Sequence, residues 1–331
     1  MNNIDIINQS ELPSLPMDTE ILNPDYYVMH YQEFIPMYIS NGKPSLDTLK
    51  TYYSAINQFI KWCVENRRHP LAMHNYQMRI YQQYLINKKY KDDSIAVKFI
   101  AIKLFFHVAI KLELITENPC EDIKTSSSFA QDEMIQYYST DQIIKICEVF
   151  KNEENSFIKY RNMAIVYLMA IEGLRCVEVH RANREDINWN IGIIYIKGKG
   201  HNRQIYPCDQ TFKILDKYLS FFPLETTIKK ENNFTPLFLS NSGNNIHGRI
   251  SRNGLRYILN NALSNANLKV AGASCHVLRH SCGTNLYAAK KDLRLVQDVL
   301  GHRDPKTTAR YAHLHNRISN RSTEVIAPTV I

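Results

Sequence analysis

The sequence predicts a mainly α protein of two domains, an N-terminal helical bundle and a C-terminal α+β domain with a small β-sheet. Three observations predict this class. The chain has 331 residues, which is more than one domain usually contains. Apolar residues recur at helical spacing through most of it. One stretch, residues 191–207, instead has the pattern of two short strands joined by a turn.

The composition argues against a membrane protein or a secreted one. The longest apolar runs, such as 164–171, are too short to cross a bilayer. Residues 1–24 contain acidic residues but no lysine or arginine, unlike a signal peptide. The seven cysteines form no CxxC pair, which fits the reducing cytoplasm. We therefore expect a cytoplasmic protein with no membrane partner.

Positive charge is concentrated in the C-terminal part of the chain. The formal net charge is +8. Residues 1–25 carry five acidic and no basic residues, residues 26–122 carry 12 basic and 9 acidic, and residues 123–331 carry 28 basic and 18 acidic. An excess of positive charge in one region of the chain suits a polyanionic partner such as DNA. Many soluble proteins are mildly basic, so charge alone leaves the partner open.

The first 121 residues predict an acidic leader followed by a helical domain. Residues 1–25 contain three prolines and no sustained periodicity, so we expect a loosely ordered leader. Residues 26–121 have helical periodicity throughout, and Ser45 is a suitable N-cap for one of the helices. We predict a small bundle with helices at 27–39, 45–66, 71–88 and 94–112.

Two loops of this bundle are basic. We interpret their cations as contacts to the DNA backbone. Cations also gather at helix ends because they offset the helix dipole, and this alternative stays open. The residues are Arg67, Arg68, Lys88, Lys89 and Lys91.

A polar segment at 122–137 predicts a linker, and the second domain is expected at 138–316. Within it, residues 161–172 are apolar on nearly every side, which indicates a buried central helix. A glycine ends that helix and places Arg175 at the start of the next one, with Glu178 one turn later. A buried arginine there would need such a carboxylate to neutralise its charge.

The predicted hairpin has a basic turn. Lys199 lies between two glycines, where a substrate can approach closely. A surface turn without function has the same composition, so both interpretations stay open. We place Arg203 of this turn among the residues that contact DNA, with Arg252 and Arg256 near the start of a helix predicted at 254–266.

Groups suited to phosphodiester chemistry gather near the C-terminal end. His276, Arg279 and His280 are spaced to lie on one side of a helix, and Tyr311 follows after a turn and a short helix. A phosphodiester under attack gains negative charge, which a planar guanidinium binds with two parallel donors. A tyrosine hydroxyl, with a pKa near ~10, needs a base such as histidine to act as a nucleophile.

Six positions, in order, resemble the active-site signature of the tyrosine recombinases, also called the phage integrase family. The lysine lies 24 positions after the first arginine, the later histidine lies 23 positions after the second arginine, and the tyrosine lies nine positions after that histidine. The similarity covers 140–315, whereas 26–122 fits the family's core-binding domain only in length and class. The six are Arg175, Lys199, His276, Arg279, His302 and Tyr311.

The resemblance implies a role for each position. Tyr311 attacks the scissile phosphate and forms a 3′-phosphotyrosyl link, while Lys199 protonates the departing 5′ oxygen. Arg175 and Arg279 hold the non-bridging oxygens. Because the phosphotyrosine conserves an ester bond, a 5′ hydroxyl from another strand can reverse the step. The resemblance therefore implies a site-specific DNA recombinase that uses no metal, no ATP and no other cofactor.

Four further residues complete the implied site. His276 handles proton transfer, and His302 steadies the phosphate or the transition state. Glu178 and His280 are supporting residues. The sequence departs from the family pattern at Ala182, where a larger aliphatic residue is usual, and at Lys291, where glycine is common. Neither departure touches a catalytic position.

Three alternatives are weaker. His276, His280 and His302 could bind zinc, but no glutamate follows His276 as in a zinc protease, and Arg279 beside a dication would be unfavourable. A catalytically silent DNA-binding protein of the same fold would not require Tyr311 or Lys199. A type IB topoisomerase shares much of the chemistry, but the compact hairpin and the motif at His276 fit recombinases better.

The resemblance also implies partners. We expect the two domains to close around double-stranded DNA as a clamp, and a homotetramer to assemble on DNA with two protomers per recombination site. The tail at 317–331 is expected to pack on a neighbouring protomer. Accessory DNA-bending or directionality factors are possible partners. The role in integration, excision or resolution, for a Xer-like or a mobile-element enzyme, stays open.

Overall fold

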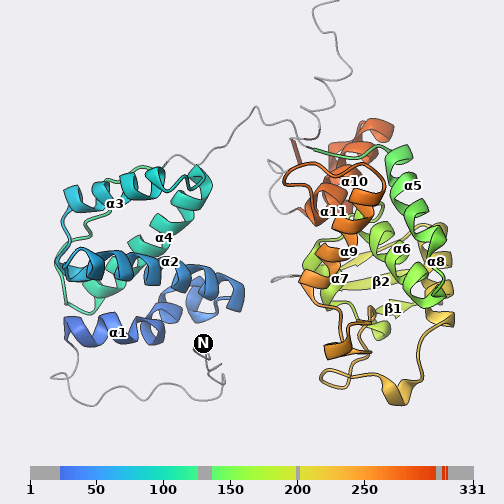
Figure 1. The fold of residues 1–331 in the computed structure, drawn as a ribbon, viewed down its shortest axis with the longest axis horizontal. Coiled ribbons are helices and arrows are strands. Elements are labelled where there is room, and N and C mark those ends of the chain that lie inside the picture. The colour runs from blue at the N-terminus through green and yellow to red at the C-terminus, as the bar shows by residue number, and fades with distance from the viewer. Residues whose placement is uncertain (1–22, 126–135, 199–201, 303–307, 310, 312–331) are drawn as a thin grey trace, which may run out of the picture. The chain divides into compact units, whose positions relative to one another are not determined.

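The computed structural model describes residues 23–125, 136–198, 202–302, 308–309 and 311, which belong to two compact units, residues 1–131 and 132–331 (Figure 1). The predicted class, mainly α with a small sheet, is confirmed. The leader up to residue 22, the middle of the predicted linker, and the tail lie outside the described residues. The same holds for Lys199.

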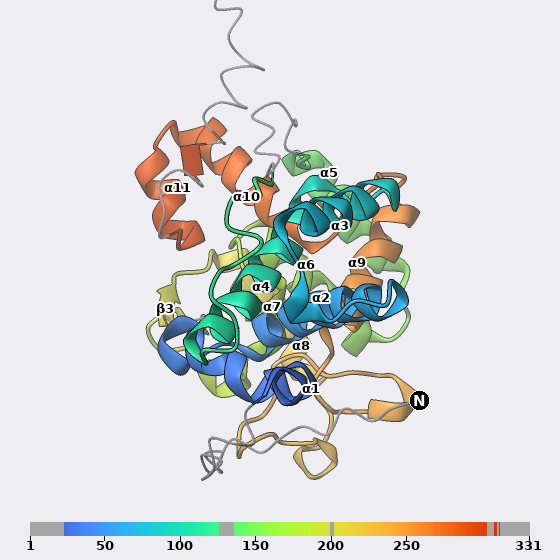
Figure 2. The same cartoon turned by 90° about the vertical axis from the view of Figure 1, so that its left-hand side faces the viewer.

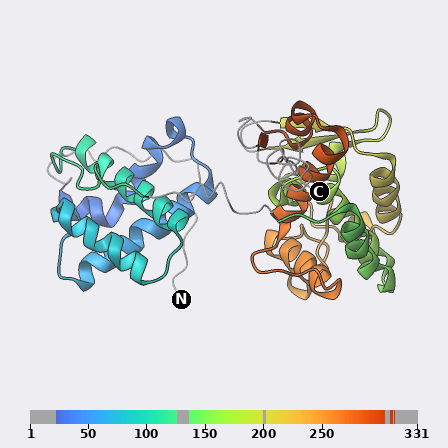
Figure 3. The ribbon, with the colours of Figure 1, turned by 90° about the horizontal axis from the view of Figure 1, so that it is seen from above.

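The described part of the first unit is a bundle of α1 (Pro24–Phe34), α2 (Leu46–Glu65), α3 (Asn75–Asn87) and α4 (Asp92–Lys111). Figure 3 shows these helices from above, and α2 packs against α4 along most of its length. Ser45 caps α2 as predicted, since its Oγ accepts from the Thr48 amide. The core between the helices is apolar and largely aromatic, and it includes Ile56, Phe59, Phe99, Ile102 and Phe106.

Two helices of this bundle are shorter than predicted. The first α-helix ends at Phe34 and continues as a 3-10 turn, Ile35–Tyr38, which contains a proline. The third begins at Asn75 rather than at residue 71, after a 3-10 turn at Pro70–Ala72. The carboxamide oxygen of Gln77 accepts from the backbone N–H of His74, so the helix starts there.

The second unit is built around α6 (Ser156–Ala170), which is buried on most sides and lies between α8 (Asp209–Ser220) and α10 (Cys275–Lys290) (Figure 1). The predicted central helix is therefore confirmed, although it begins earlier than residue 161. The other α-helices of this unit are α5 (Thr140–Glu148), α7 (Cys176–Arg181), α9 (Arg252–Asn265) and α11 (Leu293–Leu300).

A three-stranded antiparallel sheet lies in the second unit, in the order β1 (Ile187–Asn188), β2 (Ile193–Lys197) and β3 (Asn202–Ile205). The predicted hairpin is the β2–β3 pair, in which Ile196 faces Arg203. The apolar run at 237–239 also predicts a short strand over 237–240, and this prediction is wrong. Leu239 forms only an isolated bridge, and its carbonyl accepts instead from the buried guanidinium of Arg161 at 2.8 Å.

The helices α10 and α11 pack against each other and are joined by a sharp turn (Figure 2). Lys291 ends α10 in the left-handed conformation, with φ of +55°. Glycine adopts that conformation freely, whereas a residue with a side chain loses about 1 kcal/mol. The departure from the family pattern at this position therefore has a conformational cost. Gly301 ends α11 with φ of +62°.

The helices of the described residues offer no candidate for crossing a membrane, because none of them is both long and apolar enough.

Candidate active site

The turn after α6 places Arg175 at the start of α7. Gly173 has φ of +70°, and a Cβ there would lie 2.5 Å from the Leu300 side chain, so two independent constraints require glycine. The carboxylate of Glu178 accepts from the backbone N–H of Arg175 at 2.8 Å. This bond caps α7, and it also fixes Glu178 where both of its carboxylate oxygens meet side chains from other elements.

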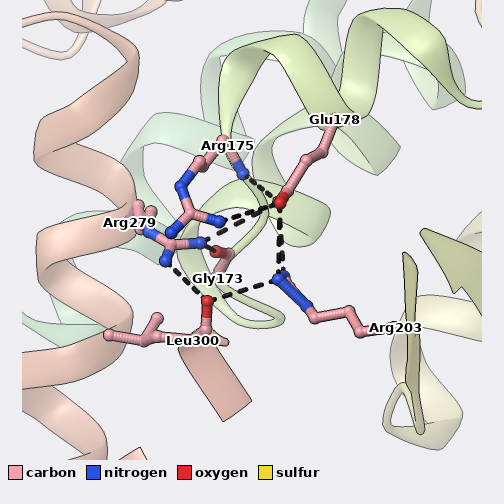
Figure 4. A network of polar contacts seen from close by, with 6 residues as sticks. All are labelled: Gly173, Arg175, Glu178, Arg203, Arg279 and Leu300. Carbon is pink, nitrogen blue, oxygen red and sulfur yellow. Dashed lines mark hydrogen bonds and ion pairs between the residues drawn. The ribbon is translucent and has the colours of Figure 1, made fainter. Parts of the chain in front are cut away.

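The carboxylate of Glu178 lies among three guanidinium groups (Figure 4). Its oxygens are 2.9 Å from Arg175 Nη1, 3.3 Å from Arg203 Nη2 and 3.9 Å from Arg279 Nη1. The carboxylate is buried, with 3% of its side chain exposed. One anion therefore faces three cations that come from α7, β3 and α10, and the cluster keeps an excess of positive charge.

Arg279 is the most buried of the three. It donates to the carbonyl of Leu300 at 2.6 Å and to the carbonyl of Gly173. Burial, followed by the nearby charge of Arg175, lowers the pKa of Arg279 to about 10. The group stays charged at neutral pH, but its charge is poorly solvated. An incoming anion would reduce the free-energy cost of burying this charge.

Arg203 lies in the same cluster, although we predicted it only as a DNA contact. It faces inward because it is paired with buried Ile196 on β2. Its Nη1 donates to the carbonyl of Leu300 at 3.2 Å, and burial lowers its pKa. The sequence could have predicted this inward direction from the pairing of Arg203 with an apolar isoleucine in the hairpin, since cross-strand partners point to the same face of a sheet. The predicted DNA contact itself remains a prediction.

Tyr311 packs against Gly283 of α10 and is buried, with 1% exposed. Its hydroxyl is 3.1 Å from Nδ1 of His280. A Cβ on Gly283 would lie 2.7 Å from the tyrosine ring, so the absence of a side chain at Gly283 makes room for the phenol. His280, predicted as a supporting residue, thus contacts the predicted nucleophile directly.

His302 stacks on Tyr311, with ring centroids 6.3 Å apart and an angle of 11° between the planes. Nδ1 of His302 lies 2.9 Å from the hydroxyl of Thr308, and Gln297 donates to the His302 carbonyl at 3.0 Å. These contacts fix the imidazole beside Tyr311. A shift of the corner after α11 would move both rings.

Two cysteines that are far apart in the sequence lie next to each other in the structure and connect the segments of Arg175 and His276. A hydrogen bond between the Cys176 and Cys275 thiols raises the pKa of Cys176 and lowers the pKa of Cys275 to about 7. Cys176 directly follows Arg175, and Cys275 directly precedes His276; both neighbours are predicted catalytic residues. The segments that carry Arg175 and His276 therefore lie against each other. The His276 side chain is exposed.

The structure thus brings together Arg175, Arg279, His302 and Tyr311, and it adds Arg203. Lys199 lies outside the described residues, although the strands on both sides of it belong to the same unit. The five basic residues of the first unit that we predicted as DNA contacts are exposed, and they lie near the ends of α2 and α3 and at the start of α4. Arg256 is exposed and Arg252 is half-buried at the start of α9. No contact in the structure tests them as DNA ligands.

An arginine cluster next to a packed tyrosine suits attack on a phosphodiester, because guanidiniums stabilise the negative charge that develops in that reaction. The chain matches the phage integrase family over residues 136–317 and the N-terminal SAM-like domain of phage integrases over residues 37–116. The chain belongs to the phage integrase family, the tyrosine recombinases.

Among its relatives is "Tyrosine recombinase XerC" of Syntrophus aciditrophicus, 30% identical over 278 residues, which cover 81% of this chain and 87% of the relative. "Tyrosine recombinase XerD" of Oceanobacillus iheyensis is 31% identical over 233 residues, or 70% of this chain and 75% of the relative.

Two solved structures show the same fold. XerH site-specific recombinase bound to a palindromic difH substrate aligns with a TM-score of 0.67 at 18% identity, over 92% of this chain and 96% of that one. A lambda integrase dimer bound to a COC′ core site aligns with a TM-score of 0.63 at 16% identity, over 86% and 97%. At these identities the likeness concerns the fold alone.

Replacing Glu178 tests whether the cluster depends on one carboxylate. We expect Glu178→Ala to lower the free energy of unfolding by about 3–5 kcal/mol, because it leaves buried guanidiniums without their counter-charge. Chemical denaturation measures the loss. Sodium sulfate should raise the melting temperature of this variant more than that of the wild type, since a sulfate ion can replace the carboxylate.

The matched control is Glu148→Ala, which removes a carboxylate from an exposed ion pair with Lys151. It should change the free energy of unfolding by no more than about 0.5 kcal/mol. Equal losses in the two variants would show that the Glu178 carboxylate does not hold the cluster.

Proposed function

We propose that this protein is a site-specific DNA recombinase that cleaves and rejoins strands of duplex DNA through a covalent bond between Tyr311 and a 3′ phosphate. The observation that carries the proposal is the convergence of Arg175 and Arg279, 104 residues apart in the sequence, beside the packed rings of His302 and Tyr311. Membership in the tyrosine recombinases supports it.

The arginines supply the binding site for the scissile phosphate. Arg175 is the most exposed guanidinium of the cluster, with 43% of its side chain accessible, so it is placed to receive a phosphate oxygen. Arg279 lies behind it with a charge that burial leaves poorly solvated. Two guanidiniums fixed before the reaction stabilise the charge that develops on the non-bridging oxygens without reorganising during the step.

Tyr311 supplies the attacking oxygen. A phenol is protonated at neutral pH, so the reaction requires a partner that takes up its proton. His280 holds the hydroxyl at 3.1 Å, while His276 on the exposed side of α10 handles proton transfer at the phosphate. The oxygen of Tyr311 bonds to phosphorus, and the bond from phosphorus to the 5′ oxygen of the DNA breaks.

Lys199 protonates the departing 5′ oxygen in this proposal. The bond between Tyr311 and phosphorus is itself an ester bond, so the energy of the cleaved phosphodiester is conserved. Attack by a 5′ hydroxyl of a second strand therefore rejoins DNA and releases the tyrosine. No ATP, metal ion or other cofactor takes part in these steps.

DNA is the proposed partner, and each unit carries basic residues that suit contacts to its phosphates. In this proposal the two units close on the duplex as a clamp, and phosphate contacts provide most of the affinity. The contacts from the first unit are Arg67, Arg68, Lys88, Lys89 and Lys91, and those from the second are Arg252 and Arg256, whereas Arg203 is paired with Glu178 inside the cluster.

Recombination joins two sites that are each cut on both strands. We infer a homotetramer on DNA with two protomers per site, and we assign the tail at 317–331 to contacts between protomers. The enzyme acts in the cytoplasm, in integration, excision or resolution, on a chromosomal or mobile-element site, with accessory DNA-bending factors where the reaction needs direction.

Replacing the nucleophile tests the chemistry. Incubation with a nicked suicide substrate should give a protein–DNA adduct on a denaturing gel, and Tyr311→Phe should abolish the adduct because it removes the attacking oxygen. DNA binding by this variant, measured by gel shift, should stay within about twofold of the wild type, since a single buried hydroxyl contributes little to phosphate affinity. An adduct that persists in Tyr311→Phe would show that another residue attacks.

The role of Lys199 is tested with a better leaving group. Lys199→Ala should slow cleavage of ordinary DNA by about 10²–10⁴-fold, the usual contribution of a general acid. A substrate with sulfur in place of the bridging 5′ oxygen leaves without protonation, so it should restore the rate. If single-turnover cleavage of this substrate stays as slow as that of ordinary DNA, Lys199 is not the acid.

Removal of the tail tests its role in assembly. A chain ending at Asn316 should still bind one site but lose cooperative loading of a second protomer, because the proposed contact between protomers is missing. Native gels over a range of protein concentration measure this cooperativity. Unchanged cooperativity would assign assembly to another surface.

A further inference from the structure

The side chain of Arg203 connects three elements of the second unit. It leaves β3, reaches both oxygens of Glu178 on α7 at 3.3–3.4 Å, and donates from Nη1 to the carbonyl of Leu300 at the end of α11. Figure 4 shows the guanidinium between these two acceptors. Arg203 therefore links the hairpin to the arginine cluster and to the segment that carries His302.

The segment after α11 is shaped to receive this side chain. Gly301 has φ of +62°, and a Cβ on it would lie 2.7–2.8 Å from Nη1 and Cδ of Arg203. The carbonyl of Leu300 belongs to the last turn of the helix, where acceptors lack intrahelical partners and the dipole favours cations. Arg279 and Arg203 both donate to this one oxygen.

The guanidinium of Arg203 is not placed to bind a phosphate. Both Nη atoms are bonded to Glu178 or Leu300, and the Nε atom is buried with no hydrogen-bond partner among the described residues. Its side chain is 17% exposed, against 43% for Arg175. These contacts assign Arg203 to the support of the site rather than to the DNA.

We propose that Arg203 is a positioning residue for strand cleavage. By bridging Glu178 and the Leu300 carbonyl, it fixes the Leu300–His302 corner against the arginine cluster. The imidazole of His302, which stacks on Tyr311, then lies at a fixed place beside the phosphate. This inference rests on the proposed recombinase function, because it assigns a role within that same site.

Single-turnover cleavage of a suicide substrate at saturating protein tests the inference. Arg203→Ala should lower the cleavage rate on the order of 10–100-fold, since a displacement of about 1 Å at a reacting group has an effect of that size. DNA affinity should stay within about twofold. Arg203→Lys should recover only part of the rate, because an ammonium cannot bridge the two acceptors as a guanidinium does.

Chemical rescue separates positioning from general stability. Guanidinium chloride at tens of millimolar should restore cleavage by Arg203→Ala, because the free ion can occupy the site between Glu178 and Leu300. Urea at the same concentration should not. The matched control is Arg294→Ala on α11, which removes an exposed arginine paired with Asp298 and should leave the rate unchanged.

The outcomes distinguish the hypotheses. Wild-type rates in Arg203→Ala or in a folded Arg203→Lys would overturn the inference while leaving the recombinase function in place. Rescue of Arg203→Ala by a substrate with a neutral methylphosphonate at the scissile position would also overturn it, because that result indicates direct phosphate contact. If Arg203→Ala does not fold, Arg203→Lys carries the test. Absence of any adduct with the wild-type protein would instead refute the proposed function.

Discussion

One buried carboxylate holds together the arginine cluster of the candidate active site. Glu178 lies within 4 Å of guanidiniums from α7, β3 and α10, and no other described acid shares this position among the three arginines. Buried like charges repel strongly, so the cluster exists only because the carboxylate offsets part of that repulsion. Burial, with a smaller effect from the nearby charge of Arg175, lowers the pKa of Arg279 and of Arg203 although Glu178 raises both, and three cations still face one anion. The remaining positive charge is what a DNA phosphate would neutralise.

The surrounding fold brings these charges within reach. Three close approaches depend on glycine: Gly173 lets the Leu300 side chain pack, Gly283 makes room for the Tyr311 ring, and Gly301 lets Arg203 pass. Each is a place where two segments distant in sequence meet with no side chain between them. The central helix α6 provides the apolar surface on which α8 and α10 lie. Packing precision, rather than the motif residues alone, therefore decides the geometry of the site.

Much of this arrangement could be predicted from the sequence. Helical spacing placed Arg279 and His280 on α10, a glycine placed Arg175 at a helix start, and the family resemblance connected them with His302 and Tyr311. The sequence did not show that Arg203 faces Glu178, because the inward direction of a strand is set by the packing of its sheet. Nor did it show which histidine contacts Tyr311, since three candidates have compatible spacing. The helix starts at residues 71 and 161 and the strand at 237–240 were wrong, because side-chain caps and a buried arginine redirect the backbone there.

The most direct measurement is a structure of the protein with DNA trapped as the phosphotyrosyl intermediate on a suicide substrate. We expect a bond from Tyr311 to the 3′ phosphate, donation by Arg175 and Arg279 to the non-bridging oxygens, and Arg203 still bound to Glu178 and the Leu300 carbonyl. A phosphate bound away from Arg175 and Arg279, or linked to a residue other than Tyr311, would contradict the proposed mechanism.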